Sequence, residues 1–268
     1  MNTSLQGVSN EFDGRIAIVT GGGSGIGASL AQHFSSLGTH VAIVDLDPES
    51  ATARRDDITE AGGSASAYTA DVRDGYAMRD LCRRIVDEHG SIDICVANAG
   101  AIGPEDFFAA TPDDWDRVID VNTKGVAHTC RAAAEHMAEQ KNGRMLVTLS
   151  YNAFRSGPHV IPYRVSKAGS FMFVRSLALL MAPYGVTVNA ICPGVTMTEM
   201  QKGYAAEVAE RRGISLDEYF DERRARIPMG EFTTFEDLNE LAGFLVSDSA
   251  RHITGQAIAP DGGVLASS

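Results

Sequence analysis

The chain has 268 residues, of which 44% are hydrophobic and 22% are charged, and this balance predicts a globular protein with one sizeable core. It carries 23 basic and 35 acidic residues, a formal net charge of −12 with His neutral. Such an acidic chain argues against nucleic acid or an anionic membrane as a partner, because phosphate binding needs clustered Lys and Arg.

The sequence also argues against membrane spans, metal clusters and disulfides. No run approaches 18 apolar residues, and the polar start of the chain, which we expect to be a flexible tail over 1–13, lacks the apolar core of a signal peptide. The cysteines, at positions 82, 95, 130 and 192, fit no C-x-x-C or zinc-finger spacing. We therefore expect reduced, mostly buried thiols, no metal and a cytoplasmic protein.

Short apolar runs alternate with helical patterns along nearly the whole chain. The predicted strands cover Arg15–Thr20, Val41–Asp45, Ala67–Asp71, Ile92–Ala97, Met145–Leu149, Val186–Ile191 and Gln256–Ala259. The predicted helices cover Ile26–Leu37, Pro48–Ala61, Tyr76–His89, Asp113–Glu139, Pro162–Ala182 and Phe235–Leu245. Because near-continuous apolar strands are buried on both faces, this alternation predicts an α/β fold. We expect a single domain over 1–268, a doubly wound Rossmann-type parallel sheet of about seven strands with helices on both faces.

One charged stretch interrupts this alternation. Thr196–Arg226 follows a predicted strand and resembles an inserted helical segment rather than a further sheet unit. Insertions at strand ends often cover binding sites, so we expect a helical substrate lid over 196–230.

The first predicted strand leads into a glycine-rich turn, TGGGSGIG at 20–27, and a helix follows at once. Glycines let the backbone turn tightly and approach a pyrophosphate, and the helix start supplies unpaired N–H groups. A glycine turn without a ligand is the alternative, but the strand–turn–helix placement favours a dinucleotide site. The turn lacks the Lys-Ser/Thr ending of a nucleoside triphosphatase loop, which disfavours ATP and GTP.

Asp45 closes the second predicted strand, and its position favours one dinucleotide. A carboxylate there accepts hydrogen bonds from the adenosine ribose and repels a 2′-phosphate, and no cation follows at Leu46. The sequence therefore predicts NAD rather than NADP as the cofactor. The alternative role, capping the next helix, suits Asp47 better because Pro48 follows it.

Tyr163 and Lys167 stand four residues apart near the start of a predicted helix, on one face. An ammonium favours the phenolate, so Lys167 and a bound nicotinamide cation are expected to lower the tyrosine pKa from about 10. Such a tyrosine takes a proton from an alcohol near neutral pH. The pair alone occurs by chance, but Ser150 closes another strand, where side chains line the ligand crevice.

In order and spacing, these motifs resemble the short-chain dehydrogenase/reductase family of the common 250-residue type. The resemblance covers 14–263 and includes TGGGSGIG at 20–27, ADV at 70–72, ANAG at 97–100, Ser150, YxxxK at 163–167, PGV at 193–195 and DGG at 261–263. Ala97 stands where the family commonly has Asn, which we expect to alter only strand packing. The lid and tail are similar in style to the polyol, acetoin/butanediol and sorbitol-phosphate dehydrogenase branch.

The resemblance implies a catalytic tetrad of Asn122, Ser150, Tyr163 and Lys167. Tyr163 would be the general acid/base, Ser150 would orient the substrate oxygen, and Lys167 would hold the nicotinamide ribose. Asn122 would anchor a water in a proton relay. Cofactor contacts are implied at Gly21, Ser24, Gly25, Ile26, Gly27, Asp45, Leu46, Asp71, Val72, Asn98, Ala99, Gly100, Tyr163, Lys167, Pro193, Gly194, Val195 and Thr198. The resemblance also suggests a homotetramer.

The predicted substrate site comprises Ser150, Asn152, Arg155, His159 and Tyr163. Arg155 either binds a carboxylate, sulfonate or phosphate or is a solvated loop residue, and for His159 a structural role is favoured. We expect NAD-dependent interconversion of a secondary alcohol and a ketone in a small polar diol, polyol or hydroxy acid, with an anionic group as one option. The alternatives are a hydroxysteroid or 3-hydroxyacyl dehydrogenase and a non-catalytic dinucleotide sensor, which the intact Tyr163 and Lys167 disfavour.

Overall fold

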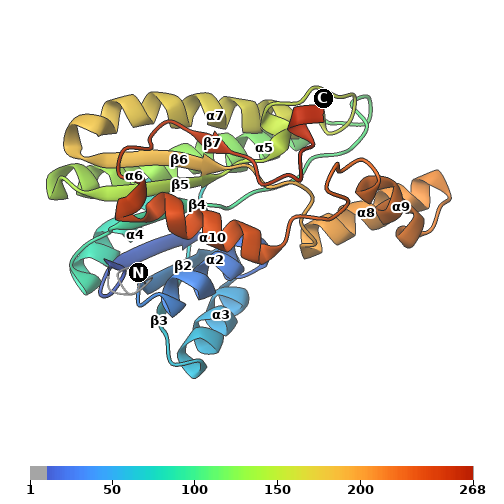
Figure 1. The fold of residues 1–268 in the computed structure, drawn as a ribbon. Coiled ribbons are helices and arrows are strands. Elements are labelled where there is room, and N and C mark those ends of the chain that lie inside the picture. The colour runs from blue at the N-terminus through green and yellow to red at the C-terminus, as the bar shows by residue number, and fades with distance from the viewer. Residues whose placement is uncertain (1–10, 268) are drawn as a thin grey trace, which may run out of the picture.

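The computed structural model describes residues 11–267, and a seven-stranded sheet lies at its centre (Figure 1). The strands are β1 (Ile16–Thr20), β2 (His40–Asp45), β3 (Ser64–Thr69), β4 (Ile94–Ala97), β5 (Gly143–Thr148), β6 (Val186–Ile191) and β7 (Ala257–Ile258). Every neighbouring pair is parallel, in the order β3-β2-β1-β4-β5-β6-β7. The direction of strand progression reverses between β1 and β4, where ligands bind in such sheets. The predicted fold class is confirmed.

Helices cover both faces of the sheet (Figure 1). One face carries α2 (Gly25–Ser36), α3 (Pro48–Glu60) and α10 (Phe235–Val246), and the other carries α4 (Gly75–His89), α6 (Val126–Gln140) and α7 (Ile161–Met181). Consecutive β1 residues point to opposite faces, so Ile18 and Val19 belong to different hydrophobic clusters and both are fully buried. Double burial explains the continuous apolar runs in the sequence.

The helix expected over Asp113–Glu139 is interrupted by a wider turn. It consists of α5 (Pro112–Ile119), a π-helical turn η2 (Asp120–Gly125) and α6, which follow one another without a break. A π turn takes in an additional residue, and such turns are frequent at functional sites. Asn122 lies in this turn, fully buried.

The third strand begins and ends earlier than predicted. It covers Ser64–Thr69 instead of Ala67–Asp71, so Asp71 lies beyond its carboxyl end. The strand is at the sheet edge, its sequence SASAYT consists largely of small residues, and only Tyr68 is buried. Such a half-exposed edge strand gives a weak hydrophobic pattern.

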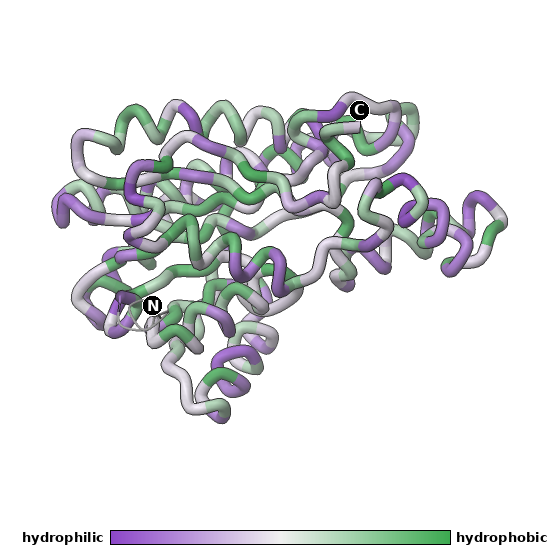
Figure 2. The backbone as a smooth tube through the Cα atoms, in the orientation of Figure 1, coloured by the Kyte–Doolittle hydropathy of each residue, from purple (hydrophilic) through white to green (hydrophobic). Residues whose placement is uncertain are grey.

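Two helices, α8 (Glu199–Arg212) and α9 (Leu216–Arg224), extend beyond the main body of the sheet and helices (Figure 1). They lie within the predicted lid segment, and Figure 2 shows many hydrophilic positions along them, in contrast to the strands. A separate small cluster around Val208, Tyr219 and Phe220 holds the two helices together.

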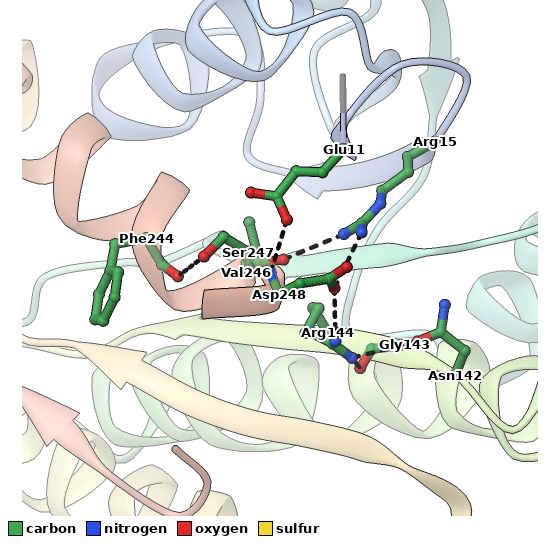
Figure 3. A network of polar contacts seen from close by, with 9 residues as sticks. All are labelled: Glu11, Arg15, Asn142, Gly143, Arg144, Phe244, Val246, Ser247 and Asp248. Atoms are coloured by element: carbon green, nitrogen blue, oxygen red, sulfur yellow. Dashed lines mark hydrogen bonds and ion pairs between the residues drawn. The ribbon is translucent and has the colours of Figure 1, made fainter. Parts of the chain in front are cut away.

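The described start of the chain is anchored rather than free. Phe12 is 1% exposed, which contradicts the expected flexible tail for 11–13, while residues 1–10 lie outside the described part of the chain. A polar network fixes this region at the amino ends of β1 and β5 (Figure 3). The carboxylate of Asp248 accepts hydrogen bonds from Arg15 at 3.2 Å and from the buried Arg144 at 3.0 Å. The backbone N–H of Asp248 donates a hydrogen bond to the carboxylate of Glu11 at 2.8 Å.

The four cysteines are free and buried, as predicted. One helix of the described chain, α7 with its continuation to Tyr184, is long and apolar enough by length and composition to cross a membrane. Core helices pass the same test, and α7 packs against β6.

Candidate active site

A cavity of about 940 Å³ opens at the carboxyl ends of the strands and reaches to α8 and α9. All the expected cofactor contacts except Gly27 line it. Gly27 has another role, because a Cβ there would lie 2.1 Å from the carbonyl oxygen of Gly21. The missing side chain lets α2 pack closely on the turn.

The glycine turn forms a cradle of backbone groups. Gly21 and Gly25 have φ angles of +62° and +54°, which favour glycine. Ser24 caps α2 without a side-chain hydrogen bond, so the first N–H groups of the helix have no side-chain acceptor there. Asn98 braces the turn by donating to the carbonyls of Thr20 and Gly21 at 3.1 and 3.2 Å. These residues fit a dinucleotide pyrophosphate.

Asp45 borders the cavity next to this cradle. Its carboxylate accepts hydrogen bonds from the N–H of Gly23 at 2.9 Å and from the N–H of Asp47 at 3.1 Å. Asp47 is the residue that caps α3, as predicted. Beyond Asp45, Asp71 is engaged by Arg73 at 2.6 Å, and both residues line the cavity.

Tyr163, Lys167 and Ser150 all line the cavity and lie close to one another. Lys167 is 3% exposed and donates to the carbonyl of Thr148 at 2.8 Å, while its Nζ lies 5.6 Å from the centre of the Tyr163 ring. Ser150 follows β5, and its Oγ accepts from the N–H of Asn152 at 3.2 Å. The structure therefore brings together a phenol, an ammonium and a hydroxyl.

The protonation of this group differs from the sequence-based expectation. Burial raises the pKa of Tyr163 to about 12, although a hydrogen bond with Ser150 works against the rise. Burial lowers the pKa of Lys167 to about 8. The expected depression of the tyrosine pKa is therefore absent in the protein alone, because removal from water outweighs the hydrogen bond with Ser150.

Asn122 does not line the cavity, unlike the other three tetrad residues. Its amide nitrogen donates to the carbonyl of Ala101 and to Ser166, and its amide oxygen accepts from the N–H of Ala101 at 2.8 Å. Ser166 in turn donates to the carbonyl of Tyr163 at 2.7 Å. Asn122 thus ties the loop after β4 to the first turns of α7, which makes it a positioning residue here.

Of the remaining expected substrate residues, Asn152 and His159 line the cavity and Arg155 does not. The side chain of Arg155 is exposed, and its carbonyl accepts from Arg164 at 2.6 Å. A loop residue of this kind can turn outward without loss of packing, so of the two expected alternatives the structure shows Arg155 as a solvated loop residue. His159 approaches Glu105 at 3.4 Å, and Glu105 also pairs with Arg211 of α8.

Several residues at the substrate end were not predicted. Tyr151, Arg164, Glu105 and Arg223 all line the cavity. Arg223 belongs to the charged sequence DERRAR, whose density of arginines is a signal, but the sequence does not say which one faces inward.

Four buried polar atoms at the cavity lining have no hydrogen-bond partner among the described residues: Thr148 Oγ1, Asn152 Oδ1, Thr196 Oγ1 and Gln201 Nε2. Buried polar groups are normally paired, and these atoms belong to residues of one cavity lining. Within residues 11–267, no group of three or more His, Cys, Asp or Glu side chains is arranged to hold a metal ion.

Comparisons with known proteins agree with this arrangement. A family model described as enoyl-(acyl carrier protein) reductase matches residues 21–265. The chain is 33% identical to a 2,3-dihydro-2,3-dihydroxybenzoate dehydrogenase of Bacillus subtilis over 94% of this chain and 96% of the relative. It is 35% identical to a 3beta-hydroxysteroid dehydrogenase of Eggerthella lenta over 95% of each chain.

Solved structures are similar over nearly the whole fold. The crystal structure of an actinorhodin polyketide ketoreductase with NADPH has a TM-score of 0.90 at 30% identity, covering 93% of this chain and 97% of that one. NAD+-bound xylitol dehydrogenase has a TM-score of 0.90 at 27% identity, covering 95% and 100%. With the glycine turn, the Tyr163–Lys167 pair and Ser150 in one cavity, the chain belongs to the short-chain dehydrogenase/reductase family of oxidoreductases.

Proposed function

We propose that the protein is an NAD-dependent dehydrogenase that interconverts a secondary alcohol and a ketone in a small polar substrate. The observation that carries this proposal is the single cavity that joins the dinucleotide cradle and Asp45 to Tyr163, Lys167 and Ser150. A binding protein without catalysis would not need these three groups beside the nicotinamide end.

Each residue of the group has one task in this proposal. Tyr163 takes the hydroxyl proton during oxidation and returns it during reduction. Ser150 donates a hydrogen bond to the reacting oxygen, and Lys167 holds the nicotinamide ribose and favours the phenolate. The cofactor supplies the redox chemistry, accepting a hydride from the carbinol carbon or donating it back. Asn122 keeps the start of α7 in place.

Asp45 supports NAD over NADP. Its carboxylate lies at the cavity wall, where it repels a 2′-phosphate, and Leu46 after it is 63% exposed and carries no charge. Arg73 also lines the cavity, but Asp71 engages it.

Asn152 supports a substrate with more than one hydroxyl. Its side-chain oxygen is buried and unpaired two residues after Ser150, in position to accept a hydrogen bond from a second hydroxyl. The names of two similar proteins, a dihydrodihydroxybenzoate dehydrogenase and a xylitol dehydrogenase, also describe diol or polyol substrates. We propose that α8 and α9 form the lid over this substrate. One observation favours the hydroxysteroid alternative, namely the name of a relative that is 35% identical.

We further propose a cytoplasmic homotetramer. Four buried free thiols suit a reducing compartment. The outer side of α7 exposes Met172, Leu179 and Leu180 at 56%, 80% and 64%, an apolar surface that a second copy of the chain would cover. Light scattering on the purified protein measures the number of copies.

A substrate screen with NAD and NADP, read by NADH absorbance, tests the function. It compares polyols and hydroxy acids with hydroxysteroids and hydroxyacyl thioesters. We expect turnover of the polar group with NAD, and loss of turnover with retained NAD binding in Tyr163→Phe. An unchanged rate in that variant would remove Tyr163 from its role, and activity confined to steroids or acyl thioesters would reject the polar substrate.

A further inference from the structure

Two partly buried arginines of the cavity lining lack a carboxylate partner. Arg164 and Arg223 line the cavity, and neither forms an ion pair with another residue of the described chain 11–267. The acidic residues nearby are already engaged, because Glu105 pairs with Arg211 and Glu222 pairs with Arg212 at 2.8 Å. Guanidinium groups withdrawn from water normally have a paired anion.

Arg223 has most of its hydrogen-bonding capacity unused. Its Nη2 donates to the hydroxyl of Tyr151 at 3.0 Å, and the phenols of Tyr204 and Tyr219 lie close to it. A guanidinium carries five N–H groups, so several remain for a ligand. Three tyrosines partly shield this cation from water, and none of them neutralises it.

Arg164 is more fully committed to the protein. Its Nε donates to the carbonyl of His159 at 3.0 Å and its Nη1 donates to the carbonyl of Arg155 at 2.6 Å. Burial, together with the charges of Arg155 and Arg223, holds the pKa of Arg164 below its ordinary value. The cavity end is therefore locally positive although the whole chain carries −12. Arg164 adds charge there, and Arg223 has the free donors.

The position of Arg223 relates directly to the reaction centre. Its partner Tyr151 follows Ser150 in the chain, and the Tyr151 phenol is close enough to Tyr163 to influence its ionisation. A group held by Arg223 and Tyr151 thus lies in the same compartment as the reacting oxygen. The unpaired oxygen of Asn152 borders this space as well.

We propose that the substrate carries an oxyanion (a carboxylate, phosphoryl or sulfonate group) and that Arg223, presented by α9, is the residue that binds it. This inference rests on the proposed dehydrogenase function and names its substrate class, a hydroxylated small molecule with an anionic end. It replaces Arg155 as the anion ligand. Because Arg223 comes from the lid, the anion also holds α9 over the substrate.

Matched alcohols that differ only in the anionic group test the proposal. One set is glycerol, glycerol 1-phosphate and 2,3-dihydroxypropane-1-sulfonate, and another is 1,2-cyclohexanediol with its 3-carboxylate. With NAD saturating, we expect kcat/KM for at least one anionic member to exceed that of its neutral partner by about 10- to 100-fold, the size of a charge-assisted hydrogen-bonded contact. Arg223→Gln should bring the ratio of kcat/KM for the anionic alcohol to that for its neutral partner down toward one, and Arg223→Lys should restore part of this ratio.

Charge-matched controls separate a local contact from a general field. Arg224→Gln removes the same charge from the next position of α9, where the side chain is exposed, outside the cavity lining and paired with Asp221 at 2.7 Å. It should keep the preference. Loss of the preference in Arg155→Gln but not in Arg223→Gln would overturn the assignment to Arg223.

The outcomes also distinguish failure of the oxyanion site from failure of the proposed dehydrogenase function. If neutral alcohols are oxidised as efficiently as their anionic partners and Arg223→Gln has no effect, the oxyanion site is wrong and the dehydrogenase stands. If no member is oxidised, the same anions are titrated into the NADH complex by calorimetry. The oxyanion site is overturned if no anion binds, or if wild type and Arg223→Gln bind the anion with equal affinity. Failure to bind NADH would reject the proposed function itself.

Discussion

The ammonium group of Lys167 donates a hydrogen bond of 2.8 Å to the carbonyl oxygen of Thr148, at the end of β5. This contact spans a helix and a strand, and it places a cation where only 3% of the residue is exposed. A single carbonyl does not replace the hydration of an ammonium, which is why burial lowers the lysine pKa to about 8. The buried Lys167 ammonium therefore lowers the stability of the folded protein, and it places a positive charge beside Tyr163.

This gives the first prediction, on Lys167→Met. Below pH 8 the wild-type lysine is protonated in both the folded and unfolded states, so the folded protein bears the whole desolvation penalty. The lowered pKa corresponds to about 3 kcal/mol. Lys167→Met should therefore raise the free energy of unfolding of the cofactor-free protein at pH 7 by up to that amount while turnover is lost.

Urea unfolding at several pH values checks the sign. As pH rises from 8 to 10.5 the lysine becomes neutral in the folded state first, so the stability gap between variant and wild type should shrink over that window. A variant that is clearly less stable than wild type at pH 7 would contradict this account of Lys167.

A second prediction concerns cofactor choice at Asp45. Its carboxylate accepts a hydrogen bond from the N–H of Gly23 and lines the cavity, where we propose that the adenosine ribose binds. We expect Asp45→Asn to lower kcat/KM for NAD by about 10-fold, and Asp45→Ala with Leu46→Arg to favour NADP by providing a cation for the 2′-phosphate. Steady-state kinetics with both cofactors measure the change.

The control is Asp47→Asn, at the cap of α3, which should alter stability but not the preference between NAD and NADP. An unaltered cofactor preference in the double variant would reject Asp45 as its determinant.

A third prediction concerns the contact that fastens α8. Glu105 is partly buried and pairs with Arg211 and His159, so it joins the loop after β4 to α8, a part of the proposed lid. Glu105→Gln should weaken closure and raise KM for the substrate by about 3- to 10-fold, with a smaller change in kcat and unchanged NADH affinity. Glu210→Gln, an exposed change at the neighbouring position of α8, is the matched control. Equal KM values in the two variants would show that the Glu105 pair does not hold the lid.

A fourth prediction concerns stability at the opposite end of the sheet. Asp248 pairs with Arg15 and Arg144, whose side chains are 17% and 8% exposed (Figure 3). Asp248→Asn leaves the buried Arg144 charge without its anion, and we expect a loss of about 1–3 kcal/mol in unfolding free energy, since Asp248 itself is largely exposed. Asp80→Asn breaks an exposed i,i+3 pair and should cost under about 0.5 kcal/mol. Comparable losses in both variants, measured by urea unfolding, would count against the network.

Sequence reasoning succeeded where apolar patterns and glycine spacing carry the information. β1 is apolar up to Thr20 and β6 is mainly apolar, and both were predicted within one residue of their observed ends. The cavity position of Ser150, Tyr163 and Lys167 followed from strand ends and helix periodicity, because both are local geometry.

The failures involve information that is not local. The edge strand β3 consists largely of small residues and is partly exposed to water, so its hydrophobic pattern did not predict its ends. The direction of Arg155 depends on loop geometry, and the inward position of Arg223 depends on how α9 packs 72 residues away from its partner Tyr151. The net charge, an average over the surface, could not reveal a positive cavity end.

The π turn at Asp120–Gly125 makes the number of residues in this segment matter as much as their identity. An α-helix turns by about 100° per residue, so deleting one position here would rotate either Asn122 away from Ala101 or the buried face of α6 away from the sheet. A length change would also displace the start of α7 through the Asn122–Ser166 contact. The number of residues in this segment therefore determines the orientation of α7, the helix that carries Tyr163.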